Sequence, residues 1–435
     1  MRKARWLYNN VGLAARAVDG VARYVCGTGI IPAARSADEA WNKQAEEMFE
    51  DACGREAFGF DAAGQVNFYE AQSFIIRHVA IDGDFFGQFI KSDSGRALVR
   101  FMGAEAVGNA SAPLDQDQWQ DGVRVDRYGK PTQYRVLAEN KTNTTDVSAD
   151  DILHFRRPVR IGYTRSPSWL ARAAIHLHDM ADIVSYTKQT FKLASQPAFI
   201  IESPDAMNIG MGAALKKQDT GSGSVTLDKL YSQSGVVQLP PGSKLQQFKN
   251  EHPGNNFQAF LDFLARDISW GIGLSPEMLW SVAGIGGANT RYVLADAQVF
   301  FSELQEWLIN QFCRRFWKYW VWQEIQAGRL PLRDDWWRVD FIPPARATVD
   351  FGRDTKALLE IVRTGAMSTR RFAEMHGLDE EAEEDAAIAA AVRRKEKCEA
   401  AGLSVTDVFP PAPGSPIASE PTQDAEVATP PPADV

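Results

Sequence analysis

Residues 281–291 form the segment that most limits what chemistry the chain could perform. They read Ser-Val-Ala-Gly-Ile-Gly-Gly-Ala-Asn-Thr-Arg. A phosphate-binding Walker loop needs Gly-Lys followed by Ser or Thr, whereas Gly287 is followed by Ala288 and Asn289. A dinucleotide-binding fingerprint follows a strand, whereas this segment follows a predicted helix. The glycines therefore favour backbone mobility over phosphate binding, with an ordinary helix-to-helix connection as the simpler alternative.

Three other groups contain residue types used in metal binding or catalysis. The Asp-Gly-Asp sequence at 82–84 lacks the further regularly spaced oxygens of a cation loop, which favours a turn. His176 and His178 are two apart on a predicted helix and face different directions. The Asp-Phe-Gly sequence at 350–352 has no accompanying kinase catalytic loop. With no nucleophile elbow either, we expect no catalytic residue, no metal site and no cofactor.

Four arginines cluster at positions 156–165: Arg156, Arg157, Arg160 and Arg165. Guanidinium groups bind phosphate, and they also form salt bridges within or between subunits. The sequence leaves these two interpretations open. It contains no helix-turn-helix, zinc-finger or RNA-binding signature that would favour specific nucleic-acid recognition.

The acidity of the chain belongs to its C-terminal segment. The chain has 56 acidic and 47 basic residues, and positions 378–435 hold 13 of the acidic and 4 of the basic ones. The first 377 residues therefore contain 43 acidic and 43 basic residues. A body without net charge does not indicate general nucleic-acid affinity. The cysteines Cys26, Cys53, Cys313 and Cys398 are widely spaced and indicate reduced thiols. No apolar run reaches the roughly 18 residues of a membrane span, and the basic N-terminus is not a signal peptide, so we expect a cytosolic protein.

The hydrophobic pattern predicts long helices around a strand-rich region. Helices are expected at 4–26, from Ser36 (as N-cap, with Glu39 three residues on) through Phe49, and at 68–81, 168–196, from 256, 292–326, 354–364 and 368–400. Strands are expected at 85–90, 122–126 and 133–137 (a hairpin), 151–155, 198–201, 235–239 and 336–342. Apolar residues every four positions from Phe300 to Trp320 predict a core helix. The Pro-rich segment after Asp407 has a disordered composition.

Taken in order, several of these segments resemble the portal proteins of tailed bacteriophages in the lambda-like branch. The resemblance spans about residues 4–403. It rests on five stretches of sequence. The first is residues 9–19 followed by 27–30, and the last is residues 364–368 followed by 376–379. Between them lie Gly-Val-Arg-Val-Asp-Arg-Tyr-Gly-Lys-Pro at 122–131, Ile-Leu-His-Phe-Arg-Arg-Pro-Val-Arg-Ile-Gly at 152–162 and Ile-Gly-Leu-Ser-Pro-Glu-Met-Leu at 272–279. Where the family often has a Tyr-Ser-Ser-x-Arg-like segment, only Arg291 matches well. Relatives usually carry more residues before the first matching helix, which leaves the completeness of the N-terminus open.

The resemblance implies an α+β, portal-type subunit. The implied parts are a mixed α/β wing (1–165), a first stem helix (166–197), a small β-containing clip (198–250), a second stem helix (251–280), a tunnel loop (281–291), a long helix with the second part of the wing (292–352), a helical crown (353–407) and a disordered tail (408–435). The tunnel loop facing DNA comprises Gly284, Ile285, Gly286, Gly287, Ala288, Asn289, Thr290 and Arg291.

The resemblance also implies the partners. These are a ring of usually twelve copies at one capsid vertex, double-stranded DNA passing without sequence preference, the terminase large subunit, a head-completion protein, and the major capsid protein with scaffold. The expected location is the virion, with assembly in the host cytoplasm and no membrane contact. Two alternatives are a soluble nucleotide- or carbohydrate-processing enzyme that uses the tryptophan-rich region, and a DNA-binding module without a ring. The absence of paired carboxylates disfavours the first, and the neutral body disfavours the second.

Overall fold

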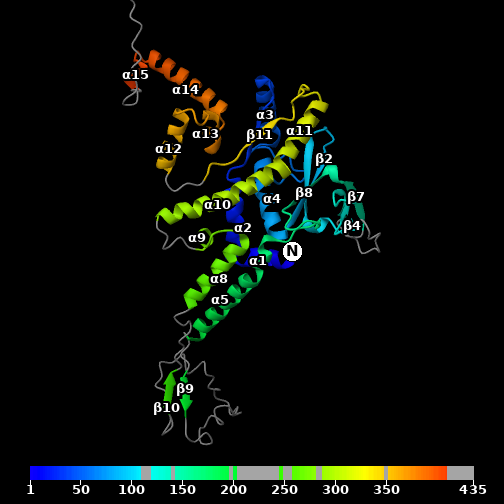
Figure 1. The fold of residues 1–435 in the computed structure, drawn as a ribbon, viewed down its shortest axis with the longest axis vertical. Coiled ribbons are helices and arrows are strands. Elements are labelled where there is room, and N and C mark those ends of the chain that lie inside the picture. Colours follow the sequence, from blue (N-terminus) through cyan, green and yellow to red (C-terminus); the bar gives the residue numbers. More distant parts are fainter. Residues whose placement is uncertain are drawn as a thin grey trace, which may run out of the picture. The chain divides into compact units, whose positions relative to one another are not determined.

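The computed structural model describes residues 1–108, 119–138, 143–194, 199–202, 244–247, 257–280, 287–346 and 351–408. The chain divides into two compact units (Figure 1). The first is Met1–Phe341 with Ala347–Val349, and the second is Ile342–Arg346 with Asp350–Val435. Both helices and strands are present, as the predicted α+β class requires.

Helices begin the first unit, and two of them differ from the sequence prediction. The expected helix 4–26 is two helices, α1 (Arg2–Asn10) and α2 (Gly12–Cys26), because Val11 between them is extended. The two preceding asparagines favour such a break, since their side chains compete for backbone hydrogen bonds. The helix expected from Ser36 is α3 (Glu39–Cys53), whose N-cap is Asp38. Ser36 does not cap it because its hydroxyl donates to Asp335.

Helix α4 (Phe68–Asp82) confirms the helix expected at 68–81 and leads directly into the sheets. It starts with a reciprocal capping box between Asn67 and Glu70. The first sheet places β2 (Asp84–Lys91) between β3 (Ala97–Gly103) and β8 (Ile152–Arg156), all antiparallel. Four further antiparallel strands follow in order: β4 (Trp119–Gln120), β5 (Val123–Val125), β6 (Pro131–Leu137) and β7 (Thr144–Ser148). The β5–β6 pair confirms the predicted hairpin.

A long helical segment crosses the core of this unit. It comprises α10 (Gly287–Leu308), a π-helical turn (Ile309–Cys313) and α11 (Arg314–Gln326). Its predicted apolar stripe is buried from Leu304 to Trp320 and packs against rings from α3 and α4. The prediction of a core helix is confirmed. After it, β11 (Val339–Ile342) pairs with β1 (Ile31–Ala34), three residues later than expected because a turn occupies 334–337.

Two helices, α5 (Ala174–Ala194) and α8 (Phe257–Ile272), pack side by side (Figure 1). The first starts later than the expected 168 because Ser168 caps a separate 3-10 turn, Trp169–Ala171. Between them in sequence, β9 (Phe199–Glu202) pairs antiparallel with β10 (Lys244–Gln247). The strand expected at 235–239 lies outside the described residues. A short helix, α9 (Pro276–Leu279), follows α8. Within the described ranges, no helix is long and apolar enough to cross a membrane.

The second unit is helical: α12 (Phe351–Arg363), α13 (Thr369–Met375), α14 (Glu380–Ala400) and α15 (Val405–Val408). The single helix expected at 368–400 is therefore two helices. Gly377 separates them with φ of +72°, and an added Cβ would lie 2.9 Å from the Ala345 amide nitrogen. Residues 409–435, expected to be disordered, lie outside the described residues. All four cysteines are buried free thiols.

Candidate functional site

The turn between α8 and α9 packs against the second half of α10. Gly273 ends α8 with φ of +93°, a conformation that side-chain-bearing residues rarely adopt. The amides of Gly273 and Leu274 both donate to the Ser269 carbonyl, at 3.0 Å each. The Cβ that Gly273 lacks would meet the Phe300 ring of α10 at 3.5 Å. The turn therefore packs closely against α10.

The segment predicted as a tunnel loop, 281–291, includes the start of a helix. Helix α10 begins at Gly287, so residues 287–291 form its first turn rather than a loop. No proline interrupts this stretch, and Ala288 is a strong helix former, so the helix extends back beyond the expected Tyr292. Asn289 and Arg291 are exposed there, and Thr290 is half-buried. Residues 281–286, with Gly284, Ile285 and Gly286, lie outside the described residues.

A cavity of about 460 Å³ lies beside the first turns of α10. Asn289, Tyr292 and Asp296 line it from α10, and Arg266 and Trp270 line it from α8. Tyr292 and Trp270 are among the most exposed large side chains of the chain. The start of α10 thus presents a polar and aromatic surface together with the end of α8.

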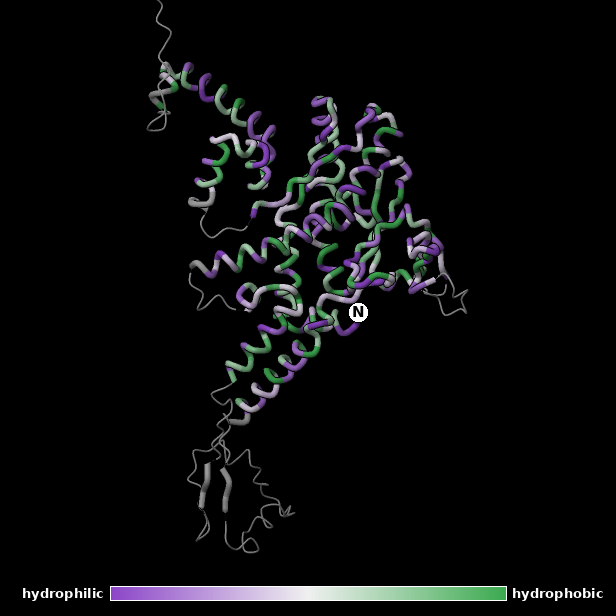
Figure 2. Tube along the Cα trace, in the orientation of Figure 1, coloured by the Kyte–Doolittle hydropathy of each residue, from purple (hydrophilic) through white to green (hydrophobic). Residues whose placement is uncertain are grey.

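The α5–α8 pair is held by one apolar face on each helix. Leu177 and Met180 of α5 are buried, as are Leu264, Ala265 and Ile268 of α8. Figure 2 shows hydrophobic residues recurring along both helices. His176 Nε2 lies 3.2 Å from Asp267 on α8, whereas His178 Nδ1 lies 3.2 Å from Asp182 on its own helix. The two histidines face different directions, as the sequence predicted.

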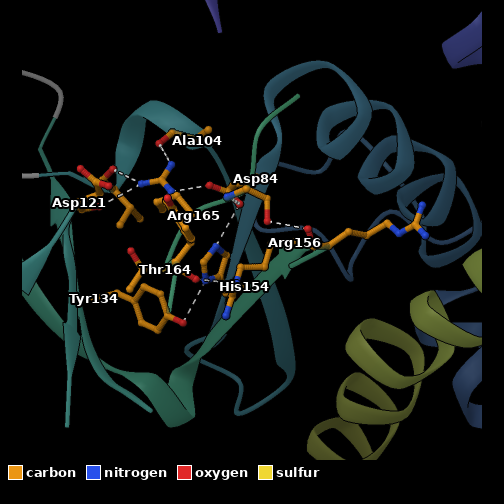
Figure 3. Close-up of polar contacts among 12 residues, drawn as sticks. Asp84, Ala104, Asp121, Tyr134, His154, Arg156, Thr164 and Arg165 are labelled. Atoms are coloured by element: carbon orange, nitrogen blue, oxygen red, sulfur yellow. Dashed lines mark hydrogen bonds and ion pairs between the residues drawn. The ribbon is translucent and has the colours of Figure 1, made fainter. Parts of the chain in front are cut away.

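Arg165 forms an ion pair inside the subunit. Its Nε lies 2.5 Å from Asp84 Oδ2, and its Nη atoms donate to the carbonyls of Ala104, Val107 and Asp121 at 2.8–3.1 Å. Figure 3 shows this guanidinium directed between Asp84 and the Ala104 carbonyl. With so many donors engaged, Arg165 links β2 to the segment after β3 and to the turn between β4 and β5.

Asp84 is buried between Arg165 and His154 (Figure 3). Burial opposes its ionisation, but contacts with His154 and Arg165 hold the pKa of the Asp84 carboxyl below its usual value. Burial also lowers the pKa of His154 to about 4 despite the nearby carboxylate. His154 is therefore neutral at pH 7, with Nδ1 3.2 Å from the Tyr134 hydroxyl. At that pH, Arg165 supplies the charge that stabilises Asp84.

The other three arginines differ in their surroundings. Arg156 Nη1 donates to the Tyr163 carbonyl at 3.1 Å. Arg157 is half-buried over the rings of Trp169 and Phe300, with Glu303 4.0 Å away. Arg160 is exposed. The four arginines therefore have different surroundings within the subunit.

The Asp-Gly-Asp sequence at 82–84 is a turn between α4 and β2, as expected. Arg5 lies 2.7 Å from Asp82 and also pairs with Glu105, and Arg165 pairs with Asp84. Gly83 has φ of +91°, and an added Cβ would meet the Ser166 carbonyl oxygen at 2.1 Å. The two carboxylates thus serve as anchors for arginines from distant segments.

Sequence reasoning missed three residues near the arginine cluster. Arg172 and Trp169 come from the 3-10 turn and its end, and Glu303 comes from α10. Trp169 and Arg172 lie outside the predicted cluster, and Glu303 is more than 130 residues from it in sequence. Local spacing gives no signal for such contacts, since only the tertiary fold brings these segments together.

Comparisons with known proteins agree with this architecture. Residues 1–281 match the family model of phage portal proteins, lambda family. The neck of an empty gene transfer agent particle, computed with C6 symmetry, contains a similar chain, with a TM-score of 0.53 and 14% identity over 87% of this chain and 94% of that one. A chain in the virion of a native gene transfer agent particle is also similar, with a TM-score of 0.51 and 14% identity over 87% of this chain and 92% of that one. At this identity, the two structures show a shared fold. No curated protein matches the chain by sequence.

Proposed function

The chain belongs to the lambda family of phage portal proteins, and on that basis we propose that copies of it form a closed ring whose channel passes double-stranded DNA. The family match over residues 1–281 is the observation that carries the proposal. Twelve copies at one capsid vertex are the expected number. The ring acts during DNA packaging and again during ejection, as a structural channel rather than as an enzyme.

We propose that α5 and α8 are the stem helices and that residues 198–250 form the clip between them. The polar and apolar contacts of the α5–α8 pair support the first assignment, because a paired helix unit can hold a projecting segment in place. The clip would bind the terminase large subunit during packaging and the head-completion protein afterwards. Residues 1–165 and 292–352 would form the wing, and 353–407 the crown.

Residues 281–291 are proposed to face the DNA. The described end of this segment is the first turn of α10, where Asn289 and Arg291 are exposed. The first turns of α10 line one cavity with residues of α8 and the start of α9, which gives the preceding glycines an attachment point on the subunit. A glycine-rich segment attached in this way could adjust to a moving DNA helix.

Weak contact with DNA suits a channel through which DNA must move. Each phosphate that a protein neutralises adds affinity through counterion release. The first 377 residues, with 43 charges of each sign, carry no net charge to hold DNA in place. The balance of charge thus supports sliding without sequence preference.

The remaining partners and the location follow from the proposed role. We expect contacts with the major capsid protein and scaffold during assembly, which would take place in the host cytoplasm. The mature protein would then lie at the capsid vertex of the virion.

Negative-stain electron microscopy with mass photometry of the purified protein tests the ring. Rings with a central hole and a mass near twelve subunits are expected. A monomer at every concentration contradicts the ring and favours the enzyme alternative, which predicts activity in a single subunit.

Deleting residues 284–289 tests the DNA-facing role. Intact rings that package or retain less DNA are expected. Loss of the ring itself would assign this segment to subunit assembly instead.

A further inference from the structure

The arginine cluster lines a cavity that the proposed channel function does not explain. The cavity measures about 870 Å³ and lies where the segment after β8 meets the 3-10 turn and the end of α8. Arg157, Arg160, Arg165 and Arg172 contribute to its wall. Among the described residues, no Asp or Glu lines it. A cavity with this lining is suited to an anionic group.

Three of these arginines carry charge that the subunit leaves largely uncompensated. Arg165 is neutralised by Asp84, but the described residues offer Arg157 only Glu303, 4.0 Å away with a side chain that is 64% exposed. Burial lowers the pKa of Arg157, and the positive charge of Arg172 lowers it further, while Glu303 acts in the opposite direction. Arg160 and Arg172 are exposed, and their side chains make no hydrogen bond or ion pair with any residue that the structure describes.

Arg157 is already positioned for binding. Its guanidinium carbon lies 5.4 Å from the Trp169 ring centre and 5.7 Å from that of Phe300. Stacking of this kind restricts the plane of a guanidinium while leaving its N–H edge free to bind a carboxylate or phosphate with two hydrogen bonds. The entropy cost of ordering the side chain is thereby reduced before an anion arrives.

The charge balance of the chain favours another protein subunit over DNA. Because the first 377 residues are neutral overall, a local positive surplus must be matched by a negative surplus elsewhere in the same residues. Two different complementary surfaces on one subunit are what a head-to-tail ring interface requires. Phosphates held in an arginine cavity would instead resist the sliding of DNA.

We propose that the cavity formed by Arg157, Arg160 and Arg172 receives carboxylates of an acidic segment from a neighbouring copy of this chain. This inference rests on the proposed ring. It assigns the cavity a role in closing the ring rather than in contacting DNA.

The first test measures assembly without DNA. The double variant Arg160→Glu with Arg172→Glu is compared with Arg100→Glu with Arg127→Glu, which changes two exposed arginines in the strand-rich region by the same charge. Mass photometry should show that the cavity variant needs about tenfold or more protein to form rings, because like charges then face each other. The control variant should assemble as the wild type does. Circular dichroism checks that both variants fold.

The second test identifies the partner group. The double variant Arg160→Lys with Arg172→Lys is treated with a carbodiimide, which couples a lysine amine to a carboxylate in direct contact. Covalent dimers joining Lys at 160 or 172 to an Asp or Glu of another copy are expected on a denaturing gel and by mass spectrometry. Wild-type protein lacks these amines and should not give the same linkage.

The outcomes separate this inference from the proposed function. If the wild type forms no ring, the proposed function fails before any variant is considered. If rings of the glutamate variant assemble normally, only the cavity inference is overturned. If those rings also bind a short DNA duplex less tightly than wild-type rings do, the cavity contacts phosphate instead.

Discussion

The core around α11 and the α5–α8 pair use aromatic residues in opposite ways. In the core, Phe316 is fully buried, and its ring centre lies 4.8 Å from Phe60 and 5.7 Å from Phe68. On α8, Phe260, Phe263 and Trp270 are 48%, 61% and 65% exposed. These three recur on a face of α8 separate from its buried residues, so α8 has a second apolar face beside the one that packs against α5.

This difference indicates which parts of the molecule are complete as a single subunit. The core buries its aromatic side chains against one another and should fold in isolation. The outer face of α8 gains stability only when something covers it, since exposed groups of large apolar side chains usually mark a contact surface. Mutations in the core should therefore lower the stability of the subunit. Mutations on the exposed face of the helix pair should instead impair ring assembly.

The largest effect on subunit stability is expected from Phe316→Ala. Removing a fully buried phenylalanine typically costs about 3–5 kcal/mol through lost transfer free energy and the cavity left behind. Denaturant unfolding of the unassembled subunit measures the change. A loss below about 1 kcal/mol would contradict the contrast between core and helix pair.

Arg165→Ala should destabilise the subunit by a similar amount, about 3–5 kcal/mol, because it leaves the buried Asp84 carboxylate without its cation. Adding Asp84→Asn should recover part of this loss, since the uncompensated charge is then removed. Denaturant unfolding of both variants gives the two values. Equal stability of the single and double variants would indicate that Arg165 acts through its carbonyl contacts instead.

Acidification should weaken the subunit through His154. Its pKa lies at about 4 in the folded state, below the ordinary 6.5, so the unfolded chain binds this proton first as the pH falls. The stability present above pH 6.5 is lost as the pH approaches 4, by about 3 kcal/mol from this residue. Unfolding measured from pH 7 to pH 4 should show a smaller loss for His154→Gln than for the wild type. An unchanged slope contradicts the assignment.

The smallest effect on the subunit is expected from Phe263→Ala, the same substitution made on the exposed face of α8. Its unfolding free energy should change by less than about 1 kcal/mol. Ring formation, measured by mass photometry, should be reduced because this face is the one left uncovered. If Phe263→Ala costs the subunit as much stability as Phe316→Ala does, this face of α8 is covered by other residues of the same subunit.

Regular periodicity predicted most of the fold well. The helix at 68–81, the β-hairpin and the core stripe of α10–α11 depend on local patterns that tertiary contacts reinforce. Predictions were wrong where a distant residue competed for a hydrogen bond or where a glycine interrupted a helical pattern. Ser36 matched a capping box, but Asp335, about 300 residues away, binds its hydroxyl. At 368–400 the helical pattern concealed the break at Gly377.

The candidate site was less accessible to sequence reasoning. The four arginines were visible as a cluster, but their different roles depend on Asp84, Trp169 and Glu303, which come from three separate elements. The glycine-rich segment was recognised, whereas its last five residues are helical. Spacing along a chain shows which residue types are available, and only packing shows which of them become neighbours.

The π-helical turn Ile309–Cys313 marks a place where this long helical segment can gain or lose one residue. Apolar residues spaced four apart rotate by about 40° per step around an α-helix, and a wider turn partly reverses that rotation. Leu304 and Trp320 consequently face the same core, although Leu304 precedes the turn in sequence and Trp320 follows it. A wide turn of this kind corresponds to one residue inserted into an α-helix. Deleting Asn310, which is exposed, could therefore restore continuous α-helix without changing the orientation of either half. Natural single-residue length variation in this helix should be concentrated here.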